Sequence, residues 1–229
     1  MTSGESPLRI GLVALFMTAL ATAQLTASKV LMFELPFALP IAGSSLVLPG
    51  AALAYALTFL ASDCYAELYG RRAATVVVNV GFVMNFVLLA LVWSTILSPV
   101  FPDSPVGAAE FRSVMASSTG VVVGSLFAYV VSQNWDVFVF HRLREYTDGE
   151  ALWLRNIGST ASSQLIDTAI FVTVAFVVFQ GLPPQAALAL GVGQYVFKLL
   201  IALLDTPVVY AIVGAARRAD PDLRAVHAD

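Results

Sequence analysis

The stretch FLASDCYAELYGRR, residues 59–72, closes an apolar run and places two carboxylates inside it. Asp63 and Glu67 lie one helical turn apart, and the apolar residues before them predict a helix buried in lipid. A charged side chain near the centre of such a helix costs about 3 kcal/mol or more unless it is paired or hydrated. The stretch therefore predicts a membrane-spanning helix whose acidic residues face a polar interior.

The composition supports a membrane protein. The chain has 229 residues, of which 59% are hydrophobic and only 12% are charged, and its mean hydropathy is +0.83. A soluble domain carries about 25% charged residues to cover its surface. The net charge of −3 comes without a basic patch, which argues against a nucleic-acid partner. The single cysteine, Cys64, excludes a disulfide framework and a multi-cysteine metal site.

The chain contains apolar stretches of spanning length. Six are predicted, over residues 9–31, 46–69, 73–98, 112–141, 156–180 and 186–215. The first is too long for the apolar core of a signal peptide, so we expect a retained helix. The predicted fold class is an all-α, polytopic bundle of six transmembrane helices. A single transmembrane domain over residues 1–216 is expected, followed by a polar cytoplasmic tail over 217–229.

Basic residues separate between the two ends of these spans. One end has Arg9, Arg71, Arg72, Arg142, Arg144, Arg155, Arg217, Arg218 and Arg224, and the other has Arg112. Positively charged residues collect on the cytoplasmic side of membrane proteins. We therefore expect a multi-pass protein of the cell membrane, in contact with the lipid bilayer, with both termini in the cytoplasm.

Polar residues recur on restricted faces of the predicted helices. In the sixth span Gln194, Lys198 and Asp205 are spaced i, i+4 and i+11, which places them in one stripe. This pattern predicts a polar cavity within the bundle, because lipid-facing charges are costly. The predicted substrate-binding residues are Asp63, Gln133, Asn134, Asp136, Gln164, Asp167, Gln194 and Lys198. Residues with a predicted role in coupling or gating are Lys29, Glu67 and Asp205.

Several of these charges also have structural interpretations. Glu67 is four residues before Arg71, a spacing typical of an ion pair on a helix. Asp136 is six residues from Arg142, which is close enough for the long arginine side chain to reach it. Lys29 lies near the end of its predicted span and could extend to the membrane surface.

Lys198 likewise has two interpretations. It could contact the substrate, or it could neutralise Asp167 or Asp205 in a structural pair. The second interpretation needs no ligand, and the sequence leaves both open.

Catalytic motifs are missing from the chain. It has no G-x-x-x-x-G-K-[ST] phosphate loop, no H-E-x-x-H and no G-x-S-x-G. Two histidines are too few for most metal sites. The sequence therefore favours binding or moving a molecule over transforming one, with no enzyme activity, metal or cofactor expected.

Four segments together resemble the queuosine precursor transporter family, also called the vitamin uptake transporter family. They are TFLASDCYAELYGRRAA, FAYVVSQNWDVFVFHRLRE, LWLRNIGSTASSQLIDTAIF and YVFKLLIALLDTPVVY. The resemblance implies import of a 7-deazapurine, either 7-cyano- or 7-aminomethyl-7-deazaguanine, for the modified tRNA bases queuosine or archaeosine. Carboxylates suit the N–H donors of such a ring and amides suit its carbonyl, while Tyr55, Tyr129, Trp135 or Tyr195 could stack on it.

Two further functions remain open from sequence. The first is the substrate-capture subunit of an energy-coupling-factor transporter, in which small residues on the first helix dock a partner. Ala19, Ala23 and Ala27 have the required spacing, although close packing within the chain explains them equally well. The second is an intramembrane enzyme. The coupling ion is not evident, and a homodimer also stays open.

Overall fold

A computed structural model describes residues 6–39, 43–147, 152–219 and 223. The chain packs as two compact units. The first unit consists of Met1–Lys29, Gly50–Met115 and Phe197–Asp229, and the second consists of Val30–Pro49 and Ala116–Val196. The single domain expected over residues 1–216 stays a prediction, and most of the expected tail lies outside the described residues.

The protein is mostly helical. Its helices are α1 (Pro7–Thr26), α2 (Ala52–Tyr69), α3 (Arg71–Leu97), α4 (Ala108–Met115), α5 (Ser117–Tyr146), α6 (Leu152–Phe171), the π-helix η1 (Val172–Val178) and α7 (Pro184–Ala219). Among the described residues, five helical segments are long and apolar enough to cross a membrane: Pro7–Thr26, Arg71–Leu97, Ala108–Tyr146, Ile157–Val178 and Pro184–Ala219. The helix α2, which contains Asp63 and Glu67, is not among these five.

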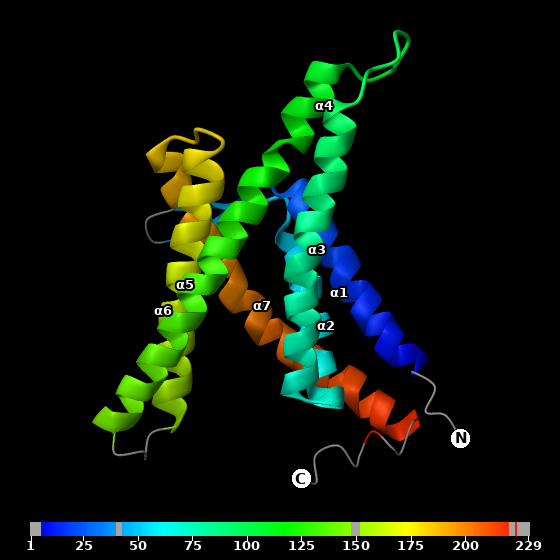
Figure 1. Ribbon diagram of the computed structural model, residues 1–229. Helices are drawn as coiled ribbons and strands as arrows, with labels where there is room; N and C mark the ends of the chain where they lie inside the picture. Colours follow the sequence, from blue (N-terminus) through cyan, green and yellow to red (C-terminus); the bar gives the residue numbers. More distant parts are fainter. Residues whose placement is uncertain (1–5, 40–42, 148–151, 220–222, 224–229) are drawn as a thin grey trace. The chain divides into compact units, whose positions relative to one another are not determined.

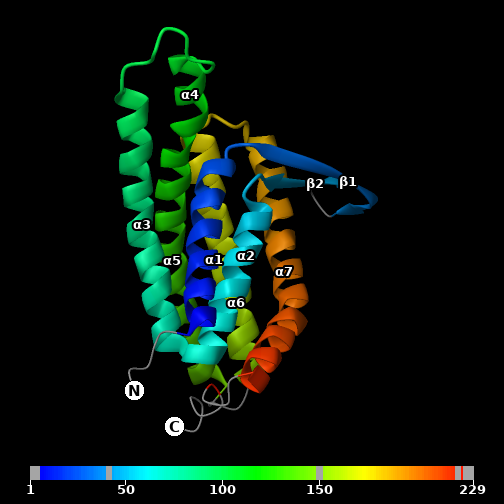
Figure 2. The ribbon, with the colours of Figure 1, turned by 90° about the vertical axis from the view of Figure 1, so that its right-hand side faces the viewer.

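A β-hairpin replaces part of the first two predicted spans. Strand β1 (Val30–Leu39) pairs antiparallel with β2 (Gly43–Pro49), with Val30 opposite Pro49 (Figure 2). The all-α prediction is therefore wrong for these residues. Apolar character alone does not separate a strand from a helix, whereas Pro49–Gly50 signals a break before α2.

Lys29 is displaced from its predicted helix by this hairpin. The helix α1 ends at Thr26, and the exposed Lys29 directly precedes β1. Its backbone carbonyl accepts a hydrogen bond of 2.6 Å from the N–H of Gly50, which closes the base of the hairpin. The prediction that Lys29 lies inside the first span is therefore wrong.

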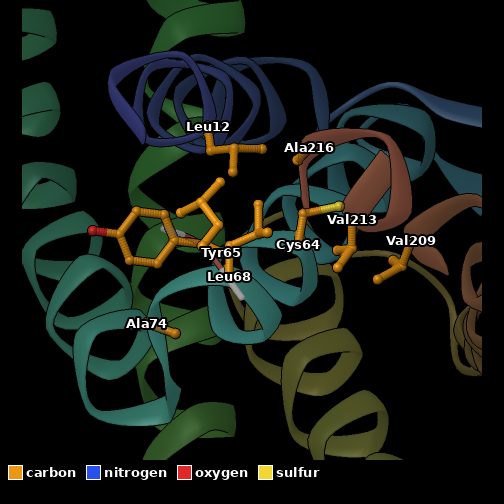
Figure 3. Packing of buried hydrophobic residues seen from close by; sticks show 9 residues of the cluster. Leu12, Cys64, Tyr65, Leu68, Ala74, Val209, Val213 and Ala216 are labelled. Carbon is orange, nitrogen blue, oxygen red and sulfur yellow. The ribbon is translucent and has the colours of Figure 1, made fainter. Parts of the chain in front are cut away.

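The helices of the first unit pack around a small apolar cluster. Figure 2 shows α1 beside α2, and α3 also contacts both helices. Figure 3 shows Leu12 of α1 with Cys64 and Leu68 of α2 and Val213 of α7. Cys64 and Leu68 are both fully buried. The cluster therefore fixes the end of α2 that contains the acidic residues against α7.

Gly70 makes the turn between α2 and α3 in a single residue. Its φ of 88° falls in a region that favours glycine, and it caps both helices. The Arg71–Arg72 pair consequently begins α3 directly after α2 ends. This tight turn places the Arg71–Arg72 pair at the same end of the unit as Glu67.

The second unit is built on the close packing of α5 against α6 and η1. Figure 1 shows α5 and α6 side by side over most of their length. Gly120 of α5 touches Phe179, because a Cβ at this position would lie 2.5 Å from the Phe179 Cβ. A Cβ at Gly124 would lie 3.1 Å from the Cβ of Ala175 in η1. Small residues therefore allow these backbones to approach closely, as in many membrane helix pairs.

Candidate functional site

Four polar residues link α5 to α6 in the second unit. The Ser132 hydroxyl on α5 donates to Asp167 Oδ1 on α6 over 3.4 Å. The Ser163 hydroxyl on α6 donates to Asp136 Oδ1 on α5 over 3.2 Å. Each helix thus supplies one donor and one acceptor, and the crossed pairing shows that the helices run antiparallel at this point.

Helical spacing explains why both pairs form together. Ser132 and Asp136 are four residues apart, as are Ser163 and Asp167, so each pair occupies one helix face. Both serines are buried, with exposed fractions of 5% and 6%, whereas both carboxylates are half-buried. A hydrogen bond from a hydroxyl to a carboxylate is stronger than one between neutral groups, and it weakens as the distance between the two oxygens increases. These serines partly offset the cost of holding two carboxylates between the helices.

The predicted amides of α5 and α6 have different surroundings. Gln133 is exposed and Gln164 is half-buried. Asn134 is exposed, and its Nδ2 donates a 2.6 Å hydrogen bond to the carbonyl of Val130 on the same helix. The Asn134 amide is therefore engaged with its own backbone, whereas Gln164 shares a helix face with Asp167, three residues later.

The first part of α7 adds an unpaired acceptor to this unit. The Tyr195 hydroxyl donates to the carbonyl of Ala161 on α6 over 3.3 Å. The adjacent Gln194 has its Oε1 buried without a hydrogen-bond partner among the described residues. Buried polar atoms in proteins are nearly always paired. Gln194 is therefore a candidate for contact with a ligand that has an N–H group.

The first unit holds two further predicted acids. Asp63 lies on α2 and Asp205 on α7, two helices that the apolar cluster joins. Asp63 is exposed, whereas Asp205 has an exposed fraction of 8% and its Oδ2 has no partner among the described residues. Asp205 shares a face with Val209 and Val213 at intervals of four residues. It therefore lies one turn beyond the apolar cluster of Figure 3.

Pro207 follows Asp205 within α7. Proline has no N–H, so the carbonyl four residues earlier, that of Leu203, loses its usual helical hydrogen bond. A carboxylate with an unpaired oxygen and a carbonyl without its helical N–H partner thus occur within about one turn of each other, in a helix that continues to Ala219.

Glu67 forms a long-range contact that local spacing did not predict. The Arg217 Nη2 donates to the backbone carbonyl of Glu67 over 2.9 Å and lies 3.8 Å from its carboxylate. This contact joins the ends of α2 and α7 in the first unit. Lys198, also on α7, is half-buried.

The predicted site residues accordingly fall into two sets. Gln133, Asn134, Asp136, Gln164, Asp167 and Gln194 belong to the second unit, whereas Lys29, Asp63, Glu67, Lys198 and Asp205 belong to the first. Sequence reasoning missed Ser132, although Ser132 and Ser163 both begin the pattern S-Q-x-x-D. In the part of the chain that the structure describes, no group of three or more His, Cys, Asp or Glu residues could hold a metal ion.

The apolar helices and the polar residues between them define a multi-pass membrane protein. Residues 49–212 match the family model described as "Putative vitamin uptake transporter". The chain is 34% identical to a "Probable queuosine precursor transporter" of Bacillus subtilis, over 69% of this chain and 68% of that protein. No solved structure matches the chain.

Two further relatives have similar names. The chain is 30% identical to a "Probable queuosine precursor transporter" of Haemophilus influenzae, over 70% of this chain and 66% of that protein. It is 26% identical to the "Queuosine precursor transporter" of Escherichia coli, over 71% of each chain. The chain therefore belongs to the vitamin uptake transporter family, and it is a transporter, not an enzyme.

Proposed function

We propose that the protein imports a 7-deazaguanine precursor of queuosine or archaeosine, either the 7-cyano or the 7-aminomethyl compound, for tRNA modification. The names of the three relatives support this substrate class. The observation on which the proposal depends is the pair of carboxylates, Asp136 and Asp167, held half-buried between two apolar helices.

Carboxylates at membrane depth suit the hydrogen-bonding edge of a guanine-like ring. Its N1–H and 2-amino group are two neighbouring donors, which one carboxylate can accept together. The ring carbonyl requires a donor, which an amide such as Gln164 supplies. Binding of such a ligand would offset the cost of holding each carboxylate inside the membrane, which is about 3 kcal/mol.

Gln133, Asn134 and Gln194 complete the proposed recognition set of the second unit. Within the first unit, considered by itself, Asp63 and Lys198 are proposed as substrate-contacting residues, and Lys29, Glu67 and Asp205 as coupling or gating residues. Asp205 is favoured among these three because its unpaired buried oxygen could accept a proton or a cation.

We also infer that α2 is a sixth span. Its 18 residues are about 27 Å long at 1.5 Å per residue, close to the thickness of the hydrocarbon core. Six spans put all the arginines except Arg112 on one side, which the positive-inside rule assigns to the cytoplasm together with both termini.

Structural features weaken the energy-coupling-factor alternative. Ala19, Ala23 and Ala27, which suggested a docking surface, have exposed fractions of 5%, 2% and 0%. A stripe that is already covered within the chain is not available to a partner. The packing interpretation of these alanines therefore accounts for the spacing.

Uptake of a radiolabelled 7-deazaguanine tests the proposed function. The full chain is expressed in cells that lack their own precursor transporter and precursor synthesis, and queuosine in tRNA is measured alongside uptake. We expect accumulation that excess unlabelled precursor suppresses and adenine does not. Accumulation no higher than in cells with an empty vector contradicts the proposal.

A further inference from the structure

The stretches SQNWD, residues 132–136, and SQLID, residues 163–167, are two copies of one pattern. The first copy lies on α5 and the second on α6. In each, serine comes first, glutamine second and aspartate fifth. The two copies lie on antiparallel helices, so a local two-fold rotation exchanges Ser132 with Ser163 and Asp136 with Asp167.

The hydrogen bonds obey the same two-fold relation. Ser132 donates to Asp167 over 3.4 Å and Ser163 donates to Asp136 over 3.2 Å, so the rotation converts one bond into the other. Many transporters bind their substrate where inverted repeats meet. The paired copies therefore form a candidate recognition element and not two unrelated polar contacts.

Each serine has a second acceptor on its own helix. Ser132 Oγ is 3.3 Å from the carbonyl of Tyr129, and Ser163 Oγ is 3.0 Å from the carbonyl of Thr160. A hydroxyl has a single proton, so the two acceptors compete for it or share it. Each serine is thereby held by its own backbone at a fixed place from which it contacts the opposing carboxylate.

A serine bond orients a carboxylate without using all its capacity. A carboxylate accepts about four hydrogen bonds, and each serine contributes one. The bond restricts rotation of the carboxyl group, and thus fixes the direction in which its remaining lone pairs point. Such pre-organisation of a binding group raises affinity and selectivity because less ordering is needed when the ligand binds.

Holding the helices together does not require these bonds. The Trp135 Nε1 already donates to Ser162 Oγ between the same helices over 3.1 Å, and Leu143 of α5 packs against Gly158 of α6. The crossed serine–aspartate pairs are therefore additional polar contacts in an interface that other residues also hold together.

We propose that Ser132 and Ser163 are positioning residues that set the specificity of the substrate site. Each fixes the carboxylate of the other copy so that it accepts the paired N–H donors of a guanine-type ring. This inference rests on the proposed function and deepens it. It specifies that selection against rings without the 2-amino group depends on two serines that need not touch the ligand.

Competition binding to the purified full chain in lipid nanodiscs tests this role. A radiolabelled 7-deazaguanine is displaced by unlabelled 7-deazaguanine or by the analogue without the 2-amino group. We expect Ser132→Ala and Ser163→Ala each to reduce the preference for the amino compound about 10-fold, as loss of about 1.4 kcal/mol would. Ser162→Ala, which removes the Trp135 bond, and Ser125→Ala, which removes a bond to the Val121 carbonyl, should keep the wild-type preference.

A matched pair of variants guards against misfolding of the alanine variants. Ser132→Thr retains a hydroxyl, and Ser132→Val has the shape of the threonine variant without a hydroxyl. The threonine variant should therefore keep the preference for the amino compound, and the valine variant should lose it. Unchanged selectivity in the alanine and valine variants, or an equal loss in Ser162→Ala, would overturn the positioning role while leaving the proposed function intact. Failure of the wild-type chain to bind any 7-deazaguanine would instead overturn the proposed function, and the positioning role with it.

Discussion

The Ser163 hydroxyl on α6 lies 3.2 Å from Asp136 Oδ1 on α5, and the serine is buried while the carboxylate is half-buried. The donating Ser163 hydroxyl is therefore buried, whereas part of the accepting Asp136 carboxylate is still accessible. Together with the reciprocal bond from Ser132 to Asp167, this bond places two acids in a helix pair whose other surfaces are largely apolar.

Neutral replacement of the second-unit acids should abolish transport without unfolding the protein. In Asp167→Asn the amide adds a donor where the substrate also has donors, so we expect uptake to fall about 100-fold or more, equivalent to about 2.7 kcal/mol. Gln164→Ala should also abolish uptake because it removes the proposed donor to the ring carbonyl. Initial uptake rates, normalised to folded protein measured by size-exclusion chromatography, provide the check. Wild-type rates in both variants would remove these residues from the site.

Asp205 should contribute to function at a cost to stability. Its Oδ2 is buried without a partner among the described residues, so the ionised group is poorly compensated there. We expect Asp205→Asn to melt at or above the wild-type temperature in detergent, while its uptake falls about 10-fold, equivalent to about 1.4 kcal/mol. A lower melting temperature combined with normal uptake would show that Asp205 is structural.

Glu67 should matter less than these acids. Its carboxylate lies 3.8 Å from the Arg217 Nη2, and both side chains are partly exposed, so the ion pair should contribute about 0–1 kcal/mol. Glu67→Gln should lower the expression level slightly and leave binding intact, because Arg217 keeps its 2.9 Å bond to the Glu67 backbone carbonyl. Arg217→Ala, which removes both contacts, should lower expression further. Complete loss of ligand binding by well-folded Glu67→Gln would place Glu67 in the site instead.

Cysteine labelling in intact cells should show whether α2 spans the membrane. The native Cys64 is buried and should give little background. With six spans, Asp103→Cys should react with a membrane-impermeant maleimide from outside, and Arg72→Cys should react only after the cells are permeabilised. Both positions are exposed in the structure. If α2 does not span, the two positions exchange their behaviour.

Helices were predictable from sequence because long apolar stretches have few other stable forms in a membrane. The hairpin was not predicted, because most of it lies between the first two predicted spans and apolar character alone does not separate a strand from a helix. The prediction also treated residues 112–141 as one helix, whereas α4 ends at Met115 and α5 begins at Ser117. A break of one residue changes the mean hydropathy of a window very little.

Only part of the candidate site could be predicted from the sequence. Spacing within a single helix is enough to assign a residue to a polar face, so Asp136 and Asp167 could be identified from the sequence. The crossed bonds to Ser132 and Ser163 depend on the register between two helices, which composition does not give. The Arg217 contact to Glu67 connects positions 150 residues apart, which spacing along one helix cannot predict.

Equilibrium binding of a radiolabelled 7-deazaguanine to the purified chain in lipid nanodiscs tests the central claim most directly. Wild type should bind the compound, and excess guanine but not adenine should displace it. Folded Asp136→Asn and Asp167→Asn should each bind the compound about 100-fold more weakly. Equal affinity in wild type and in both variants would show that these carboxylates do not bind the substrate.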